Sequence, residues 1–237
     1  MGLSSERERW ETSLDTYADI SETLLGDSIL SSAFLCYAGY FDASSRNQLS
    51  RQFENSLYEI SYRSNVSFVD FLSTASQRLS WREYGLPRDD VCMQNAVMLE
   101  RYRRYPLVID PSGQGAEYLS AYYEHQNASF VRASLMDNAF VKSLESALRF
   151  GNTLLVEDVE EIDAILNPIL NREVQRIGGR VLIRLADKLV DVSPTFKLIL
   201  LTRQESVHFT PDLVSSVTFV AMTNAPFHIH QCGLICF

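Results

Sequence analysis

The stretch YPLVIDPSGQGAEYLSAYY, Tyr105 to Tyr123, decides the fold of this 237-residue chain. An apolar run leads into a turn that contains Gly113 and Gly115, and a helical pattern follows the turn. A strand, a glycine turn and then a helix form the setting in which backbone N–H groups and a helix N-terminus bind phosphate. The turn therefore invites comparison with the phosphate-binding loop G-x-x-x-x-G-K-[ST].

The turn departs from that loop at three of its four signature positions. With Gly115 aligned to the second glycine, Asp110 replaces the first glycine, Ala116 replaces the lysine and Glu117 replaces the hydroxyl residue. The chain thus lacks the lysine that neutralises phosphates and the hydroxyl that binds Mg²⁺. Two carboxylates would repel an anion by roughly 1 kcal/mol at about 4 Å in water, and by more in a dry pocket. We predict a degenerate nucleotide-binding loop made of Asp110, Pro111, Ser112, Gly113, Gln114, Gly115, Ala116 and Glu117. From the motif alone, a purely structural strand–turn–helix is the favoured alternative.

Short runs rich in branched residues alternate with amphipathic helices after residue 104. The candidate strands are 107–109, 130–133, 154–156, 198–201 and 217–220. Near-continuous apolar strands separated by helices indicate a parallel sheet that is covered on both faces. Period-two stretches at 181–185 and 189–192 predict a β-hairpin inserted before the fourth strand.

The first hundred residues show the spacing of helices. Apolar residues recur three and four positions apart, which is typical of helical segments with one buried face. In one of these segments we expect Leu49, Phe53, Leu57 and Ile60 to form that buried face.

Polar residues end two of the later strands. Glu157 and Asp158 follow the third strand, where a Walker B strand carries one acid for Mg²⁺ and one that polarises water. Their order is swapped, and two solvated acids at a strand end are an equal alternative on this pattern alone. Thr202 and Arg203 end the fourth strand, where a polar residue often senses the γ-phosphate. We interpret these pairs as a vestigial Walker B and a vestigial sensor.

Loop, acidic strand, hairpin and sensor strand follow one another in the order of an AAA+ large subdomain. The predicted fold is therefore α/β, with a P-loop-like parallel sheet flanked by helices, a β-hairpin insertion and an N-terminal helical extension.

The sequence resembles dynein heavy chains, and in particular the fifth AAA+ module of their motor ring. The resemblance is nearer to the cytoplasmic than to the axonemal type and covers residues 2–220. It is carried by ERERWE, LLGDSILSSAFLCYAGYFD, YPLVIDPSGQGAEYL, ESALRFGNTLLVEDVE, LNPILNREVQRIGGRVLIRL and TRQESVHFTPDLVSSVTFV. It implies a non-catalytic module without ATP or Mg²⁺ of its own, although other modules of the parent bind both. The family usually has arginine where this chain has Ser216, so the resemblance implies a lost arginine-finger position.

The resemblance also implies a role and an organisation. The module would be a structural and allosteric link in an ATP-driven, minus-end-directed microtubule motor. Residues 1–100 would contain the returning end of the stalk coiled coil, through about Trp10, and the junction from the fourth module. Residues 101–221 would form the degenerate AAA+ large subdomain. The last residues, 222–237, do not resemble the family and are expected to be a divergent, disordered tail of a truncated chain.

The same resemblance implies the partners and the location. These would be the neighbouring AAA+ modules and, through the full-length parent, intermediate chains, light chains and microtubules, in the cytoplasm on the cytoskeleton. Two other functions remain open: a weak ATPase that uses Glu157 or Asp158 as its base, and a free-standing fragment that binds dynein subunits.

Composition excludes several other classes. A net charge of −9 argues against nucleic acid or an anionic membrane as the main partner. No apolar run approaches the roughly 18–20 residues that span a bilayer. Four potential zinc ligands, His228, His230, Cys232 and Cys236, crowd the end of the chain. Their spacing is not that of a standard zinc finger, so no metal is expected.

Overall fold

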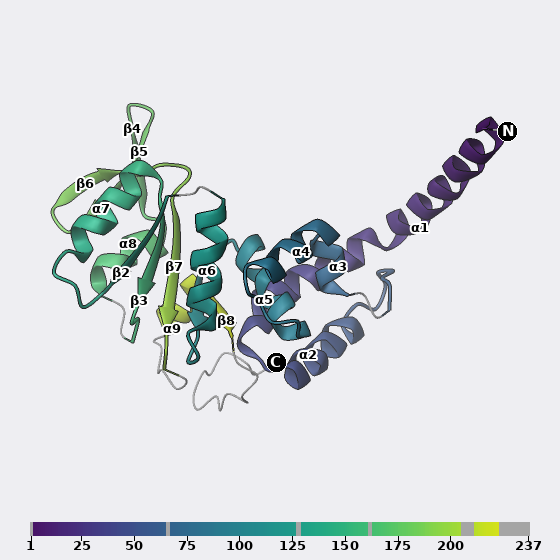
Figure 1. The fold of residues 1–237 in the computed structure, drawn as a ribbon, viewed down its shortest axis with the longest axis horizontal. Coiled ribbons are helices and arrows are strands. Elements are labelled where there is room, and N and C mark those ends of the chain that lie inside the picture. Colours follow the sequence, from purple (N-terminus) through teal and green to yellow (C-terminus); the bar gives the residue numbers. More distant parts are fainter. Residues whose placement is uncertain (1, 65–66, 127–128, 161–162, 205–210, 223–237) are drawn as a thin grey trace.

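A computed structural model describes residues 2–64, 67–126, 129–160, 163–204 and 211–222. An α/β body carries a group of helices from which one long helix projects (Figure 1). The helical part consists of α1 (Gly2–Tyr37), the 3-10 turn η1 (Ala38–Tyr40), α2 (Ala43–Asn55), α3 (Phe68–Leu72), α4 (Ala75–Glu83) and α5 (Asp90–Arg101). No described helix combines the length and the apolar character needed to cross a membrane.

The body is built on a parallel five-stranded sheet. Its strands are β1 (Tyr105–Ile109), β2 (Phe130–Ser134), β3 (Thr153–Glu157), β7 (Lys197–Thr202) and β8 (Val217–Ala221), in the order β2-β3-β7-β1-β8. The other helical elements are α6 (Gln114–His125), α7 (Phe140–Phe150), η2 (Ala164–Leu166), α8 (Asn167–Leu170) and α9 (Pro211–Ser216). All five predicted strands are present, and they form a parallel sheet flanked by helices, as the sequence predicts.

Successive residues of the strands pack alternately into two separate hydrophobic cores, one on each face of the sheet. Val108 faces the core formed with α5 and α6, whereas its neighbour Leu107 faces the core formed with α7 and the inserted strands. This two-residue period follows from the pleat of a strand. Helix α5, which ends at Arg101, contributes Ala96 and Val97 to the same core as Val108. The core is therefore continuous across residue 100, and the division of the chain there stays a prediction.

The inserted sheet has one strand more than the predicted hairpin. It pairs β4 (Val174–Ile177), β5 (Arg180–Leu185) and β6 (Lys188–Asp191) in antiparallel order. Gly178 and Gly179, both at positive φ, form the turn between β4 and β5. All four residues of β4 are exposed, so its sequence lacks the alternation that would reveal a strand.

The predicted buried face of the second helix is wrong. Helix α2 ends at Asn55, so Leu57 and Ile60 lie beyond it, and Leu49 and Phe53 are only half-buried. The buried residue of α2 is Arg46, which is 1% exposed. Four hydrogen bonds satisfy its guanidinium, which makes the burial of this charge tolerable.

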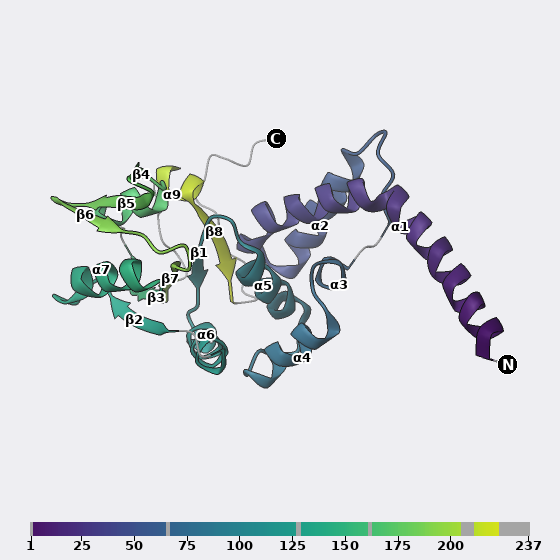
Figure 2. The ribbon, with the colours of Figure 1, turned by 90° about the horizontal axis from the view of Figure 1, so that it is seen from above.

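The helical part attaches to the edge strand β8 at a very close approach. A Cβ atom on Gly39 would lie 1.9 Å from the carbonyl oxygen of Phe219, so only glycine fits there. The ring of Tyr40 meets that of Phe219 edge-on at 5.4 Å. From this attachment α1 runs away from the body, and Figure 2 shows its N-terminal half clear of the other elements.

Candidate nucleotide-binding loop

The degenerate loop connects β1 to α6 at the carboxyl edge of the sheet. Gly113 adopts a left-handed conformation with φ of 80° and precedes the first residue of α6, Gln114. Gly115 is buried, and a Cβ there would lie 3.0 Å from Met222 and 3.1 Å from the carboxylate of Asp110. Pro111 is half-buried, while Ser112, Gln114 and Glu117 are exposed. The backbone thus keeps the compact course of an anion-binding turn.

The carboxylate of Asp110 takes up the hydrogen-bond donors of this turn. Its Oδ2 accepts the backbone N–H of Ala116 at 2.9 Å, and its Oδ1 accepts the hydroxyl of Ser112 at 3.0 Å. Asp110 is fully buried. In a working loop the N–H groups at the helix N-terminus would point at a phosphate. Here an internal anion accepts one of them, and Ala116 offers no ammonium group, so the residues present do not fit ATP.

The two acids at the end of β3 bind partners on the side away from the loop. Glu157 accepts a hydrogen bond from Arg132 at 2.5 Å, and Asp158 accepts one from Ser134 at 2.9 Å. Both partners lie on β2, whereas β7 separates β3 from the loop-bearing strand β1. Asp158 also has a positive φ of 58°, a conformation that is uncommon outside glycine. Glu157 and Asp158 therefore lie at the same edge of the sheet as the loop. Their hydrogen-bond partners are on β2, on the side of β3 that faces away from the loop.

Of the two predicted sensor residues, Thr202 is buried in the sheet and Arg203 is exposed to solvent. Thr202 is fully buried, pairs with Ile109 in register, and accepts the backbone N–H of Gln204 on its hydroxyl at 3.2 Å. Its carbonyl accepts the N–H of Asp110 at 2.9 Å. Arg203 is exposed. Ser216, at the end of α9, donates its hydroxyl to Asn171 at 3.2 Å.

No metal site is present in the part of the chain that the structure describes. It contains no cluster of three or more His, Cys, Asp or Glu side chains able to hold an ion. His228, His230, Cys232 and Cys236 lie outside the described residues, so the prediction about them remains untested.

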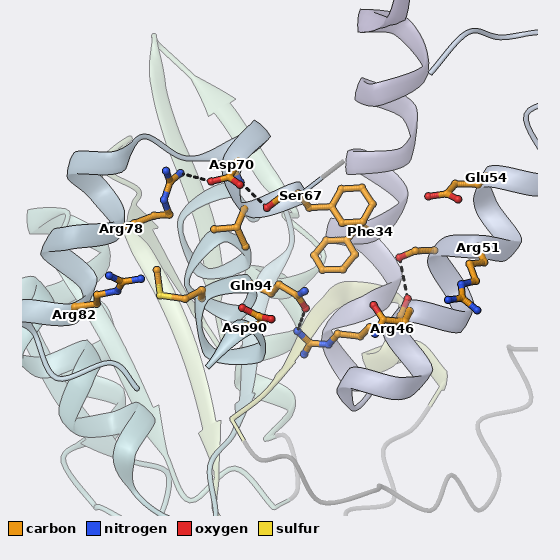
Figure 3. A pocket seen from close by; sticks show the side chains of 15 residues that line it. Phe34, Arg46, Arg51, Glu54, Ser67, Asp70, Arg78, Arg82, Asp90 and Gln94 are labelled. Atoms are coloured by element: carbon orange, nitrogen blue, oxygen red, sulfur yellow. Dashed lines mark hydrogen bonds and ion pairs between the residues drawn. The ribbon is translucent and has the colours of Figure 1, made fainter. Parts of the chain in front are cut away.

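A buried polar bridge near the loop is absent from the sequence predictions. The guanidinium of Arg46 on α2 donates to Gln94 on α5 at 3.0 Å (Figure 3). It also donates to Asn95, the next residue of α5, at 2.8 Å. Asn95 in turn donates to the carbonyl of Ala221 at 2.6 Å, at the end of β8. The next residue, Met222, donates its N–H to Ile109 at 2.9 Å, directly before Asp110.

This bridge remains ionised and fixed. Burial lowers the pKa of Arg46 to about 10, so the guanidinium keeps its charge at neutral pH. The sequence contains many polar residues, and no spacing pattern distinguishes Arg46 and Asn95 from the rest. Only the packing of α2 on α5 brings them together.

Comparison with known proteins identifies related sequences along most of the chain. Residues 79–232 match the family model described as the ATP-binding dynein motor region, and residues 1–57 match the microtubule-binding stalk of the dynein motor. The chain is 48% identical over 233 residues to the cytoplasmic dynein heavy chain of Dictyostelium discoideum, which covers 97% of this chain. It is 47% identical over 223 residues, 93% of its length, to that of Caenorhabditis elegans. It is 35% identical over 226 residues, again 93%, to the flagellar outer-arm dynein gamma chain of Chlamydomonas reinhardtii. The chain spans 5% of the length of each of these relatives.

Proposed function

The chain belongs to the dynein heavy chain family, and from this membership we propose that it is a non-catalytic AAA+ module, the fifth of the motor ring. Its role is to link nucleotide-driven changes elsewhere in the ring to the stalk. The parent would be an ATP-driven, minus-end-directed microtubule motor in the cytoplasm. The partners would be the neighbouring modules, microtubules bound through the stalk, and the intermediate and light chains of the complex.

One observation carries the non-catalytic part of this proposal. The carboxylate of Asp110 accepts the backbone N–H of Ala116, which a bound phosphate would need as a donor. Ala116 also stands at the position where a working loop has its neutralising lysine. A phosphate entering the loop would have to displace a buried carboxylate and overcome its charge without compensation. The acids Glu157 and Asp158, bound to β2, do not favour the alternative of a weak ATPase.

The polar bridge supports the role of a link. Arg46, Asn95 and Ala221 connect α2 to α5 and then to β8, and Met222 connects β8 to the residue before Asp110. A displacement of the helical part would therefore be passed to the sheet through buried hydrogen bonds. Such packed polar contacts have discrete arrangements, which suits a rigid-body mechanism of transmission.

The exposed face of α1 supports the connection to a stalk. Trp10, Leu14 and Tyr17 are 71%, 65% and 69% exposed and follow one another at spacings of four and three. These spacings match those of the apolar positions in a coiled coil. Such positions call for a second helix from the part of the heavy chain that lies outside this sequence.

At its base, α1 is held by a buried carboxylate. Asp27, which is fully buried, accepts hydrogen bonds from the Nε of Arg63 at 2.7 Å and from its backbone N–H at 2.9 Å. Motion of the projecting half of α1 would thus be transmitted to the rest of the helical part through the contact between Asp27 and Arg63.

Calorimetry with Mg-ATP tests the non-catalytic proposal. The 237-residue chain is expected to show no saturable binding heat at Mg-ATP concentrations up to about 1 mM. A dissociation constant of about 1 mM corresponds to a binding free energy of roughly −4 kcal/mol. Binding in the micromolar range would overturn the proposal. In the intact heavy chain, Arg46→Met is expected to reduce the stimulation of ATPase activity by microtubules, while basal ATPase activity persists. An unchanged stimulation would contradict the role of the bridge.

A further inference from the structure

A pocket lies at the edge of the sheet opposite to the degenerate loop. Its volume is about 570 Å³, within the range of about 300–1,000 Å³ that is typical of small-molecule sites. Tyr105 and Lys197, the first residues of β1 and β7, line it together with the end of α6. In Figure 1 this is the edge from which the inserted sheet rises, away from the start of α6.

The walls of this pocket are rich in flat rings. Tyr102, Tyr105, Tyr122, Tyr123 and Phe196 line it. The ring centres of Tyr122 and Tyr123 lie 5.1 Å apart, and the two rings are nearly perpendicular. Tyr123 is buried and stacks on Phe130 at 5.5 Å. The half-buried rings of Tyr102 and Phe196 are therefore the ones that offer a surface to another planar ring.

Three cations stand among these rings. The guanidinium of Arg172 lies 5.5 Å from the ring centre of Tyr105, and the ammonium of Lys197 lies 5.6 Å from that of Tyr123. Arg103 is the third cation in the wall. Within the described residues, none of the three has a carboxylate at ion-pair distance.

Arg172 is held in place by its backbone. Its φ is 55°, a left-handed conformation that is costly for a residue with a side chain, and its guanidinium donates to the carbonyl of Arg103. Strained conformations of this kind persist where the surroundings require them, often at binding sites.

The carboxylate in the wall does not neutralise these cations. Glu100 already accepts hydrogen bonds from Gln77 at 3.0 Å, Trp81 at 2.9 Å and Tyr122 at 2.8 Å. With Glu100 included, the lining keeps two positive charges in a chain whose net charge is −9. Burial raises the pKa of Tyr102 and of Tyr123, so their hydroxyls stay protonated as donors at neutral pH.

We propose that this pocket binds a small phosphate monoester carried on a flat ring, the chemistry of a mononucleotide. The planar guanidinium of Arg172 suits a phosphate because it can donate two parallel hydrogen bonds. The ammonium of Lys197 supplies a second positive charge, and the half-buried rings of Tyr102 and Phe196 pack against the flat ring. This site is separate from the degenerate loop and does not depend on the role proposed for the chain.

Fluorescence of Trp81 can report binding, because its indole donates to Glu100 in the pocket wall. In a Trp10→Phe background, which removes the other tryptophan, the 237-residue chain is titrated with AMP, adenosine and inorganic phosphate. AMP is expected to bind at least about tenfold more tightly than either of the other two, because it alone offers both ring and anion. Equal affinities for AMP and adenosine, or no binding of AMP at about 10 mM, would overturn the proposal.

Charge variants then locate the site. Arg172→Ala is expected to weaken AMP binding by about tenfold or more, since it removes a charged, bidentate donor. Arg176→Ala, which removes an equal charge from the exposed strand β4, is the matched control and should leave the affinity unchanged. If Arg172→Ala loses its folded circular-dichroism spectrum, Lys197→Gln takes its place with the same expectation. An affinity that is equally reduced in the control, or unchanged in the pocket variants, would refute this site.

Discussion

Replacing Asp110 by alanine tests whether this carboxylate acts as the internal anion of the loop. It accepts the Ala116 N–H and the Ser112 hydroxyl. Hydrogen bonds to a charged group contribute about 1.5–3 kcal/mol each, and the desolvation of a fully buried carboxylate offsets part of this. The net loss of unfolding free energy in Asp110→Ala is therefore expected to be about 2–3 kcal/mol, measured by urea denaturation.

The same variant should acquire a response to phosphate. Once the Ala116 N–H is vacated at the start of α6, an external anion can accept it. At a phosphate concentration of about ten times the dissociation constant, linkage predicts a gain of about 1.4 kcal/mol in the variant and none in the wild type. Midpoints of urea denaturation are compared in phosphate and in chloride of equal ionic strength.

Glu117→Ala is the matched control for this experiment. Glu117 is an exposed carboxylate on the first turn of the same helix, and its removal should cost only about 0.3–1 kcal/mol. It should create no response to phosphate. If the wild type gains as much from phosphate as Asp110→Ala does, or if Asp110→Ala gains nothing, then the carboxylate does not occupy the place of the anion.

Three further substitutions, one of them with a matched control, test the contact between the helical part and the sheet and the buried core. Arg46→Met should lower the unfolding free energy by about 3 kcal/mol, because it leaves buried polar partners unpaired. Arg51→Met on the exposed part of the same helix should stay within about 0.5 kcal/mol in the same denaturation assay. Gly39→Ala should lower the melting temperature by several degrees, at about 2–4 °C per kcal/mol, since its Cβ would collide with a backbone carbonyl; an unchanged value would show that η1 does not press on β8. Burial, and to a lesser extent the neighbouring Asp89, raise the pKa of the Cys92 thiol to about 12. The thiol of the unfolded chain ionises near pH ~8.5, so the free energy of unfolding should be constant below that pH and should fall as pH rises toward about 12. Cys92→Ala should weaken this decline in melting temperature, and an identical pH profile would contradict the assignment.

The sheet could be predicted from the sequence, because its strands carry their own signal. Runs such as 154–156 and 198–201 are apolar on both faces, and turns and helices at regular intervals separate them. The degenerate loop was also predictable, since a missing lysine at Ala116 is visible without coordinates. The family resemblance added the expectation that the module lacks a working site.

Features that depend on tertiary packing could not be predicted in this way. Nothing in the sequence around Arg46 shows that its guanidinium is buried against Asn95, because the two residues meet only when α2 packs on α5. Strand β4 carried no alternating pattern, since both of its faces meet solvent. The bonds of Glu157 and Asp158 to β2 depend on side-chain direction at a strand end, which residue order does not specify.

The close contact of Gly39 with Phe219 has a mechanical consequence for α1. At a rise of about 1.5 Å per residue, the 36-residue helix is about 54 Å long, measured from a fulcrum at η1. A rotation of about 5° there would carry the tip through about 5 Å, close to the pitch of one helical turn. A small repacking beside β8 would thus move the free end of α1 sideways by several ångströms.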